Sequence, residues 1–310
     1  MLNLAAVVGP TAAGKTDISL ELARRLNGEI ISCDSMQVYR GMDIGTAKVS
    51  IQERSLVPHH MIDLVDPDYN FTVADYQKIT KELIKTINSR GKIPILVGGT
   101  GLYYQSVVDD YNFFPIEYQI NARRKWETIC DQKGLDYLYK YLQEVDPEYA
   151  NVISCNDQKR IIRALEVFYL TGEQFSRFQV KNTGKYNLAV VGVFLERPQL
   201  YYRIEERVDQ MLDNGLLEEV KYLRAKGYDV TLKSMQALGY KQVFYFLEGM
   251  VTWDEMVKEI KRETRRFAKR QFTWFNKDKR ICWFDPNKCP DRKDFIKNIS
   301  DYVEGQLYKM

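Results

Sequence analysis

The sequence predicts an α/β fold: a P-loop-type parallel sheet flanked by helices, with a helical insertion domain. Three observations lead to this prediction. A glycine-rich loop ending in Lys15-Thr16 lies between an apolar run and a helical pattern. Strand and helix signals alternate over the first hundred residues, which is typical of a parallel sheet with helices on both faces. After about Phe113 only helical patterns continue, until a strand signal returns near Leu188.

The first part of the chain alternates short apolar runs, which predict strands, with longer helical patterns. The helix that ends near Ser89 follows Thr72, a residue type that caps helix N-termini. Parallel strands place their carboxyl ends at one edge of a sheet, where open α/β sheets bind ligands. The predicted strands are Leu4–Val8, Glu29–Cys33 and Ile93–Val97, and the predicted helices are Gly14–Leu26 and Thr72–Ser89.

The middle of the chain predicts a helical domain inserted into this core. Residues 112–186 contain two long helical patterns, with loops at Asp146-Pro147 and Thr171-Gly172-Glu173. The core is therefore expected to comprise residues 1–111 and 187–310, with a helical C-terminal part. The expected helices of the insertion are Asn121–Leu142 and Asp157–Leu170, and the strands expected after it are Leu188–Leu195 and Ile281–Phe284.

Composition limits the class of protein. The chain has 310 residues, 45% of them hydrophobic, and a formal net charge of only +3, so a sizeable core is expected without a global basic signal. Its five cysteines are scattered without a C-x-x-C pair, which disfavours zinc and disulfides and fits a reducing cytoplasm. We expect no cleaved signal peptide, because the start runs straight into the glycine-rich loop, and no membrane-spanning helix.

The glycine-rich loop fits the P-loop pattern G-x-x-x-x-G-K-[ST], which holds diphosphate or triphosphate groups. Its backbone N–H groups and the helix dipole attract phosphate oxygens, Lys15 adds a positive charge, and the Thr16 hydroxyl suits Mg²⁺. A glycine-rich turn with an incidental lysine would explain neither the threonine nor the flanking elements. The loop does not specify the phosphate compound. Its residues are Gly9, Pro10, Thr11, Ala12, Ala13, Gly14, Lys15 and Thr16.

Two further segments follow predicted strands. Asp34 follows the second one, beside the P-loop in the expected topology, and could be a Mg²⁺ ligand, a general base or a helix cap. The turn at 98–101 follows the third, and the Thr100 hydroxyl could reach the same ligand, although such turns are often only tight connections. An ordinary NTPase carries a Walker B carboxylate after an apolar strand. Gly98 stands there instead, which disfavours ATP hydrolysis.

Basic residues gather between Lys258 and Arg280, with aromatic residues among them. At helical spacing they project away from a more apolar stripe. A solvated face over a packed stripe is the simpler interpretation, but beside a P-loop a nucleic-acid contact competes with it. The stripe consists of Val257, Ile260, Thr264, Phe267 and Gln271, and a second basic set in the insertion consists of Arg123, Arg124, Lys125, Lys159, Arg160 and Arg163.

Further motifs extend this pattern, in order, along nearly the whole chain. They are Asp34–Lys48, His59–Asp63, Gly98–Tyr103, Arg160–Val167, Leu200–Ile204, Arg207–Met211, Ala237–Lys241 and Thr264–Phe275. Together with the P-loop they resemble the tRNA dimethylallyltransferase family, also called tRNA isopentenyltransferases. The C-terminal Cys/His zinc module of some eukaryotic relatives has no counterpart, so the chain resembles the short bacterial form.

The resemblance implies transfer of a dimethylallyl group from dimethylallyl diphosphate to the exocyclic amine of the adenosine 3′-adjacent to the anticodon in tRNA. The P-loop would hold the diphosphate with Mg²⁺, and the target base would flip into the protein. Asp34 would be the general base, Thr100 would bind near the reacting centre, and Arg203 would hold the diphosphate. The positions that match tRNA contacts are Asp34, Ser35, Met36, Gln37, Thr100, Arg123, Gln158, Lys159, Arg160, Ile161 and Ile162.

The expected partners are the anticodon stem-loop of tRNA and dimethylallyl diphosphate, with no membrane, and we expect a cytoplasmic monomer. An ATP-dependent nucleotide or small-metabolite kinase, binding ATP on the same P-loop, is the alternative. A P-loop RNA-binding protein without transfer activity is a third class. A kinase would not need the basic, aromatic-rich tail, and a binding module would not need Asp34.

Overall fold

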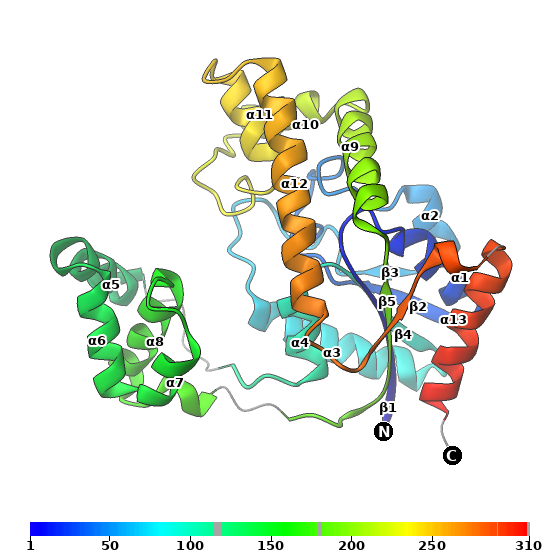
Figure 1. Ribbon diagram of the computed structural model, residues 1–310, viewed down its shortest axis with the longest axis horizontal. Coiled ribbons are helices and arrows are strands. Elements are labelled where there is room, and N and C mark those ends of the chain that lie inside the picture. The colour runs from blue at the N-terminus through cyan, green and yellow to red at the C-terminus, as the bar shows by residue number, and fades with distance from the viewer. Residues whose placement is uncertain (114–119, 179–181, 290, 309–310) are drawn as a thin grey trace. The chain divides into compact units, whose positions relative to one another are not determined.

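A parallel sheet organises the chain in the computed structural model, which describes residues 1–113, 120–178, 182–289 and 291–308. Within these residues six strands run parallel in the order β3-β2-β4-β1-β5-β6 (Figure 1). The predicted α/β class, a parallel sheet flanked by helices, is confirmed. The strands are β1 Leu2–Val8, β2 Gly28–Ser32, β3 His59–His60, β4 Ile93–Gly98, β5 Tyr186–Val193 and β6 Ile281–Phe284.

The sheet is buried on both faces. The helices that cover it are α1 Lys15–Arg25, α13 Arg292–Leu307, α3 Val73–Ser89 and α4 Gly101–Val108. Leu4, Ala6 and Val8 of β1 join the apolar cluster that contains α3 and α4, whereas Ala5 and Val7 join the one that contains α1 and α13. This two-sided burial is why the central strands β1 and β4 are apolar over most of their length.

The predicted N-cap of α3 is present and forms a capping box. The Thr72 hydroxyl accepts a hydrogen bond from the Asp75 N–H at 3.2 Å, and the Asp75 carboxylate accepts one from the Thr72 N–H at 2.9 Å. The helix therefore begins at Val73, one residue after the predicted cap.

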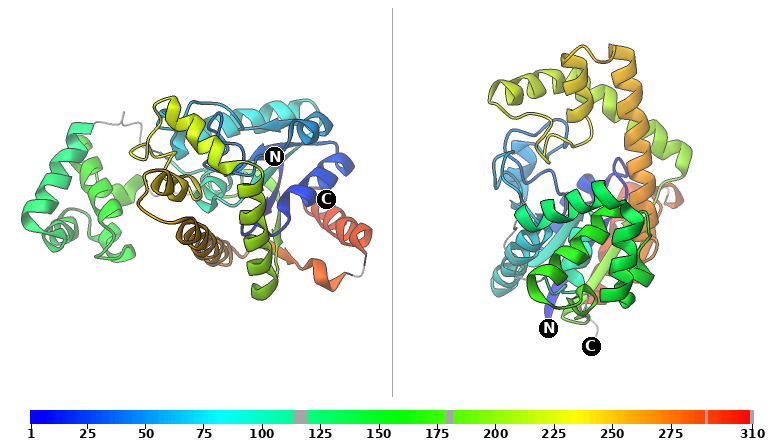
Figure 2. Two further views of the ribbon diagram at one scale, coloured as in Figure 1. Left: turned by 90° about the horizontal axis from the view of Figure 1, so that it is seen from above. Right: turned by 90° about the vertical axis from the view of Figure 1, so that its left-hand side faces the viewer.

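Four helices after β5 form the helical C-terminal part of the core. The longest, α12, packs against α9, α11 and α4, and its C-terminal end reaches the sheet (Figure 1, Figure 2). These helices are α9 Arg197–Asp213, α10 Leu216–Ala225, α11 Tyr240–Leu247 and α12 Trp253–Phe275, and the short helix α2 Ile51–Leu56 precedes β3. In the described part of the chain, no helix combines the length and apolar character that a bilayer crossing needs.

The chain divides into two compact units, one of residues 1–108 with 184–310 and the other Asp109–Thr183. The second unit has its own apolar core, which includes Trp126, Leu138, Leu142 and Leu165. Its elements are α5 Ile120–Lys133, α6 Leu135–Val145, α7 Pro147–Val152, α8 Gln158–Thr171 and the 3₁₀ helix η1 Phe175–Phe178. Residues 114–119 and 179–181 of the predicted insertion lie outside the described residues.

Two predictions about this unit were wrong. The single helix expected over Asn121–Leu142 is broken at Gly134, whose φ of 84° no helix interior allows. The loop expected at Asp146-Pro147 opens α7 instead, because the Asp146 carboxylate caps the Tyr149 N–H at 3.1 Å and proline is favoured in the first turn.

Strands β2 and β4 approach so closely that only glycine fits at position 98. A β-carbon there would lie 2.1 Å from the Cys33 carbonyl oxygen, a backbone atom that cannot move aside. We expect Gly98→Ala to lower the free energy of unfolding by about 1–3 kcal/mol, measured by urea denaturation.

Gly305→Ala is the matched control, because nothing lies within 4 Å of the β-carbon it adds inside α13. It should raise the free energy of unfolding by roughly 0.5–1 kcal/mol, since alanine is the better helix former. Equal effects from the two substitutions would contradict the crowding at Gly98.

Candidate functional site at the carboxyl edge of the sheet

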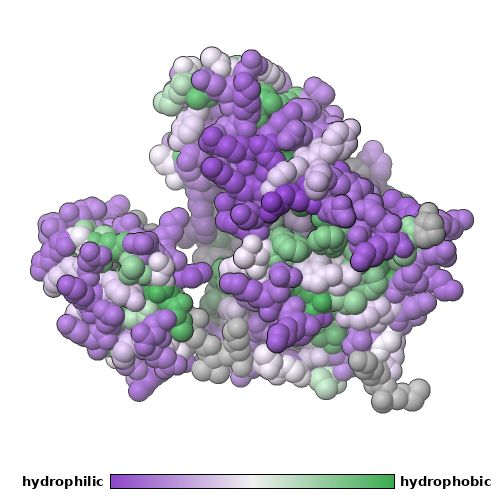
Figure 3. All heavy atoms as spheres, in the orientation of Figure 1, coloured by the Kyte–Doolittle hydropathy of each residue, from purple (hydrophilic) through white to green (hydrophobic). Residues whose placement is uncertain are grey.

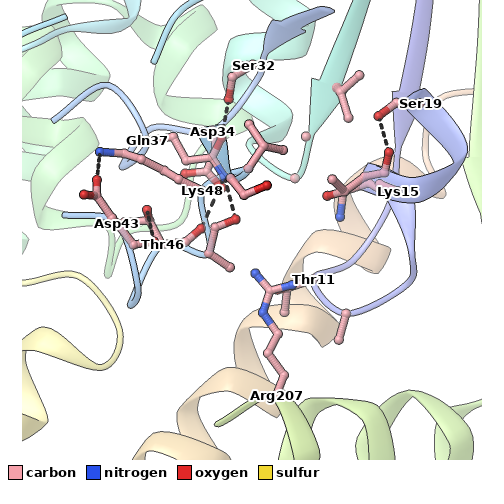
Figure 4. A pocket seen from close by; sticks show the side chains of 18 of the residues that line it. Thr11, Lys15, Ser19, Ser32, Asp34, Gln37, Asp43, Thr46, Lys48 and Arg207 are labelled. Atoms are coloured by element: carbon pink, nitrogen blue, oxygen red, sulfur yellow. Dashed lines mark hydrogen bonds and ion pairs between the residues drawn. The ribbon is translucent and has the colours of Figure 1, made fainter. Parts of the chain in front are cut away.

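A cavity of about 750 Å³ opens where β1, β2 and β4 end (Figure 4). Its size lies within the range of roughly 300–1,000 Å³ that is usual for small-molecule sites. The P-loop forms one wall, the segment after β2 a second, and helices α9 and α12 a third. Among the lining residues are Thr11, Ala12, Gly14, Lys15, Thr16, Asp34, Gln37, Gly99, Arg203, Arg207 and Gln271.

The P-loop has the backbone of an anion cradle. Gly9 and Gly14 have φ of 142° and 90°, and a β-carbon on Gly9 would lie 2.9 Å from the Val193 carbonyl oxygen. Helix α1 begins at Lys15, so the first N–H groups of the helix face the cavity without helical partners. Thr16 follows on the same turn and lines the cavity, with Pro10, Ala12 and Ala13 completing the loop.

Lys15 is a half-buried residue that lies near one positive and one negative side chain. Its Nζ donates a hydrogen bond to the Pro10 carbonyl oxygen at 2.7 Å. Burial first and the nearby Arg207 charge second lower the pKa of Lys15, against the opposing influence of Asp34, to about 7. An anion bound in the loop would favour the charged amine.

Asp34 stands at the end of β2 and faces the same cavity as Lys15 (Figure 4). Its Oδ1 accepts a hydrogen bond from the Met36 N–H at 2.9 Å, which closes a short turn. No helix begins here, so the helix-cap interpretation was wrong. The next residue, Ser35, donates its N–H to the Thr100 Oγ1 at 3.1 Å, so the hydroxyl of Thr100 holds the segment that carries Asp34.

Gln37 ties β2 to the loop that forms the far wall of the cavity. It accepts a hydrogen bond from the Ser32 hydroxyl at 2.8 Å and donates to the Thr46 carbonyl oxygen at 3.2 Å. In that loop the buried Lys48 amine contacts Asp43 at 2.7 Å and Asp63 at 2.6 Å. Met36 instead packs against the apolar core.

Two arginines of α9 face the cavity. Arg203, which was predicted, has its Nη1 within 3.7 Å of the place where a Gly14 side chain would be. Arg207 lies one turn later and points into the cavity toward Thr11 (Figure 4). In the described residues neither has an ion-pair partner, and burial lowers the Arg207 pKa against the opposing influence of Asp34. We missed Arg207 as a site residue, although its i,i+4 spacing from Arg203 is the pattern of a shared helix face.

The remaining predicted tRNA positions lie in the second unit. The Arg123 Nε contacts Glu127 at 2.9 Å, and the Arg160 Nε lies 3.4 Å from Asp157. Gln158, Lys159 and Arg160 form the exposed first turn of α8. Ile161 and Ile162 are almost fully buried in the core of this unit, so their side chains have a packing role.

The basic residues of the second half of α12 and of the segment just after it include two groups on a largely hydrophilic surface (Figure 3). One group pairs with acids: Lys261 with Asp209 at 2.7 Å, and Arg265 with Glu205 at 2.6 Å. Arg262 and Arg266 likewise pair with acids of their own helix. The other group, in the last two turns of α12 and in the residues after it, is exposed and has no ion pair within the described ranges. It consists of Lys269, Arg270, Lys277 and Lys279.

The pKa of Lys15 leads to a prediction about anion binding. At a pH of about 8 the free Lys15 amine is mostly neutral, whereas a bound diphosphate raises its pKa, so binding should take up close to one proton. Affinity for inorganic diphosphate should fall as the pH rises above about 7. Calorimetry in buffers of different ionisation enthalpy measures the uptake.

Lys15→Arg is the control, because arginine stays charged at every accessible pH. When Lys15→Arg binds diphosphate, it should take up fewer protons than the wild type, and the difference is the protonation of the Lys15 amine. Identical uptake by the variant and the wild type would mean that Lys15 is already protonated in the free protein.

The comparisons with known proteins agree with this geometry. Residues 37–278 match the family model described as IPP transferase. The tRNA dimethylallyltransferase of Syntrophomonas wolfei is 62% identical over 99% of both chains. A tRNA isopentenylpyrophosphate transferase from Bacillus halodurans has a TM-score of 0.76 and 44% identity, covering 100% of this chain and 98% of its own.

A eukaryotic dimethylallyltransferase, described in its structure as acting on tRNA, has a TM-score of 0.78 and 29% identity, covering 96% of this chain and 80% of its own. The family resemblance drawn from the motifs is thus confirmed over nearly the whole chain. The chain belongs to the IPP transferase family and is a tRNA dimethylallyltransferase enzyme.

Proposed function

We propose that the chain transfers a dimethylallyl group from dimethylallyl diphosphate to the exocyclic amine of the adenosine 3′-adjacent to the anticodon in tRNA, forming isopentenyladenosine. The observation that carries the proposal is that one cavity holds both a P-loop cradle and the Asp34 carboxylate. In the reaction the allylic C–O bond breaks, the C–N bond forms, diphosphate leaves, and the amine proton goes to a base.

The residues around the P-loop suit the leaving group. Charge builds on the diphosphate as the C–O bond breaks, and fixed N–H groups and cations stabilise it. Arg203 and Arg207 bring two cationic side chains to the P-loop end of the cavity, and Lys15 adds a third charge when a bound anion favours its protonated form. Their charge is not cancelled by ion pairs in the described residues, so it remains available to an anionic ligand.

Mg²⁺ fits this site through Thr16. No group of three metal-ligating side chains exists among the described residues, so an all-protein metal cage is not available. Mg²⁺ commonly binds through few protein oxygens together with substrate phosphates and water. The Thr16 hydroxyl would hold it there, and the ion would neutralise charge on the diphosphate.

Asp34 is the proposed general base. Its Oδ1 is held by the Met36 N–H, and no described residue donates to Oδ2, which leaves that oxygen for the amine proton. The exocyclic amine of adenine is a poor nucleophile, because its lone pair is delocalised into the ring. Removing its proton as the C–N bond forms contributes about 10²–10⁴-fold. Thr100 positions Asp34 through the neighbouring Ser35.

An ATP-dependent kinase on the same P-loop has less support. Strand β4 ends at Gly98, and Gly99, which packs against the Gln271 side chain, follows it. A glycine therefore stands where an ATP-hydrolysing enzyme would carry its Walker B carboxylate.

We further propose that the enzyme acts in the cytoplasm as a monomer, and that the second unit contacts the anticodon stem-loop through Arg123 and the start of α8.

A transfer assay with labelled dimethylallyl diphosphate and tRNA tests the proposal. The wild type should prenylate tRNA without consuming ATP. Asp34→Asn keeps the shape and the acceptor for the Met36 N–H but loses the base, so the single-turnover rate should fall by about 10²-fold or more. Its affinity for both substrates should change little.

Near-full activity of Asp34→Asn would defeat the assignment of the base. Weaker diphosphate binding that added Mg²⁺ restores would indicate a metal ligand instead. Robust ATP hydrolysis by the wild type without prenylated product would favour the kinase.

The difference between paired and unpaired basic residues on α12 and just after it predicts which of them bind RNA phosphates. Replacing Lys269, Arg270 and Lys277 by alanine removes three unpaired charges, whereas Lys261, Arg262 and Arg266 make a control set of equal charge that already pairs with acids. Each phosphate contact that is lost should reduce the salt slope of tRNA affinity by roughly 0.7–0.9. Titrations of tRNA affinity over a series of salt concentrations measure this slope. Equal slopes for the two triple variants would mean that this face of α12 is only a solvated surface.

A further inference from the structure

Gln271 joins the two glycine-containing turns of the site. Its Oε1 accepts a hydrogen bond from the Thr11 N–H of the P-loop at 2.9 Å, and its Nε2 donates to the Gly99 carbonyl oxygen at 3.0 Å. The side chain is only 6% exposed and lines the cavity. One amide of α12 therefore connects the loop after β1 with the turn after β4.

The Gln271 side chain packs so closely on the turn that no side chain fits at Gly99. A β-carbon on Gly99 would lie 2.1 Å from the Gln271 Nε2, so the turn backbone rests directly on the amide. One turn further along α12, the Trp274 ring would lie 2.2 Å from a β-carbon on Gly101. The helix thus holds the turn at two points, by a hydrogen bond and by packing.

The chain of contacts continues from this turn to the proposed base. Thr100, the residue after Gly99, donates its N–H to the Cys33 carbonyl oxygen at 3.1 Å and accepts the Ser35 N–H on its hydroxyl. Asp34 lies between Cys33 and Ser35. Gln271 is therefore the described side chain that hydrogen-bonds both to the P-loop and to the turn that supports the base.

We propose that Gln271 is a positioning residue that sets the P-loop, and hence the diphosphate donor, relative to the segment that carries Asp34. The inference rests on the proposed function. A primary amide suits this role because it accepts and donates at once, as both contacts require, without a charge beside the diphosphate. Misplacement of reacting groups by about 1 Å can cost about 10²-fold in rate.

Gln271→Met keeps the size of the side chain and removes both hydrogen bonds. Its single-turnover transfer rate at saturating substrates should fall by at least about 10²-fold, while the dissociation constants for dimethylallyl diphosphate and tRNA stay within about threefold. Thr273→Ala on the same helix is the control. Thr273 is exposed, and among the described residues its hydroxyl bonds only to the Lys269 carbonyl oxygen, so this variant should match the wild type.

Gln271→Glu separates the two contacts. Its carboxylate still accepts the Thr11 N–H but cannot donate to the Gly99 carbonyl oxygen unless it is protonated. Because burial raises a carboxyl pKa, lowering the pH from about 8 to about 6 should restore the donor. The ratio of the variant rate to the wild-type rate should then rise by about tenfold, a recovery that a packing role alone would not give.

Three results would overturn the inference: a Gln271→Met rate within about threefold of the wild type, a rate loss fully explained by weaker diphosphate binding, or a Gln271→Glu ratio that does not change with pH. If Gln271→Met does not fold, the pH dependence of Gln271→Glu still decides. The wild type in the same assay distinguishes the two proposals. If the wild type does not prenylate tRNA, the proposed function fails. If the wild type does so and the Gln271 variants behave like it, only this inference fails.

Discussion

The close approach of β2 and β4 at their carboxyl ends is the constraint on which the site depends. The Cys33 N–H donates to the Val97 carbonyl oxygen at 2.7 Å, and the Thr100 N–H donates back to the Cys33 carbonyl oxygen at 3.1 Å. This exchange is possible because Gly98 has no side chain. It places Asp34 and Thr100 side by side, and the pairing of β4 with β1 brings both next to the P-loop. Backbone geometry thus sets the relative positions of the residues to which we assign the chemistry.

Helix α9 carries acidic residues on the face toward α12 and arginines on the face toward the cavity. Glu205 and Asp209, four residues apart, pair with basic residues of α12, while Arg203 and Arg207, also four residues apart, face the cavity. This arrangement follows from the helical repeat. The face toward α12 is neutralised and contributes to packing, and the face toward the cavity keeps its charge. Burial, and after it the charge of Arg207, lowers the pKa of the neighbouring Lys15 amine.

Local patterns predicted the P-loop, the capped helix α3 and every described strand except β3, because each of these depends on residues close together in sequence. The two-residue strand β3, His59–His60, was missed, because it is too short to leave a pattern. Gly134 and Pro147 were also visible in the sequence, but whether a glycine or proline interrupts a helix or borders one depends on packing. Gln271 was assigned to a packed stripe, since its two partners are distant in sequence. The pairing of the α12 cations with α9 depends on tertiary contacts in the same way. The roles of the site residues in catalysis and RNA binding stay predictions.

Residues 109–183 have an apolar core of their own, which makes it easy for evolution to insert such a unit into an existing fold. An insert that buries its own apolar side chains adds no exposed hydrophobic surface to the sheet it interrupts. Lengthening a connection between two elements costs little, about 0.6 kcal/mol for each doubling of its length. The link between α4 and β5 could therefore acquire a whole folded module at small thermodynamic cost. Selection could then change the module's surface without disturbing the packing around the P-loop.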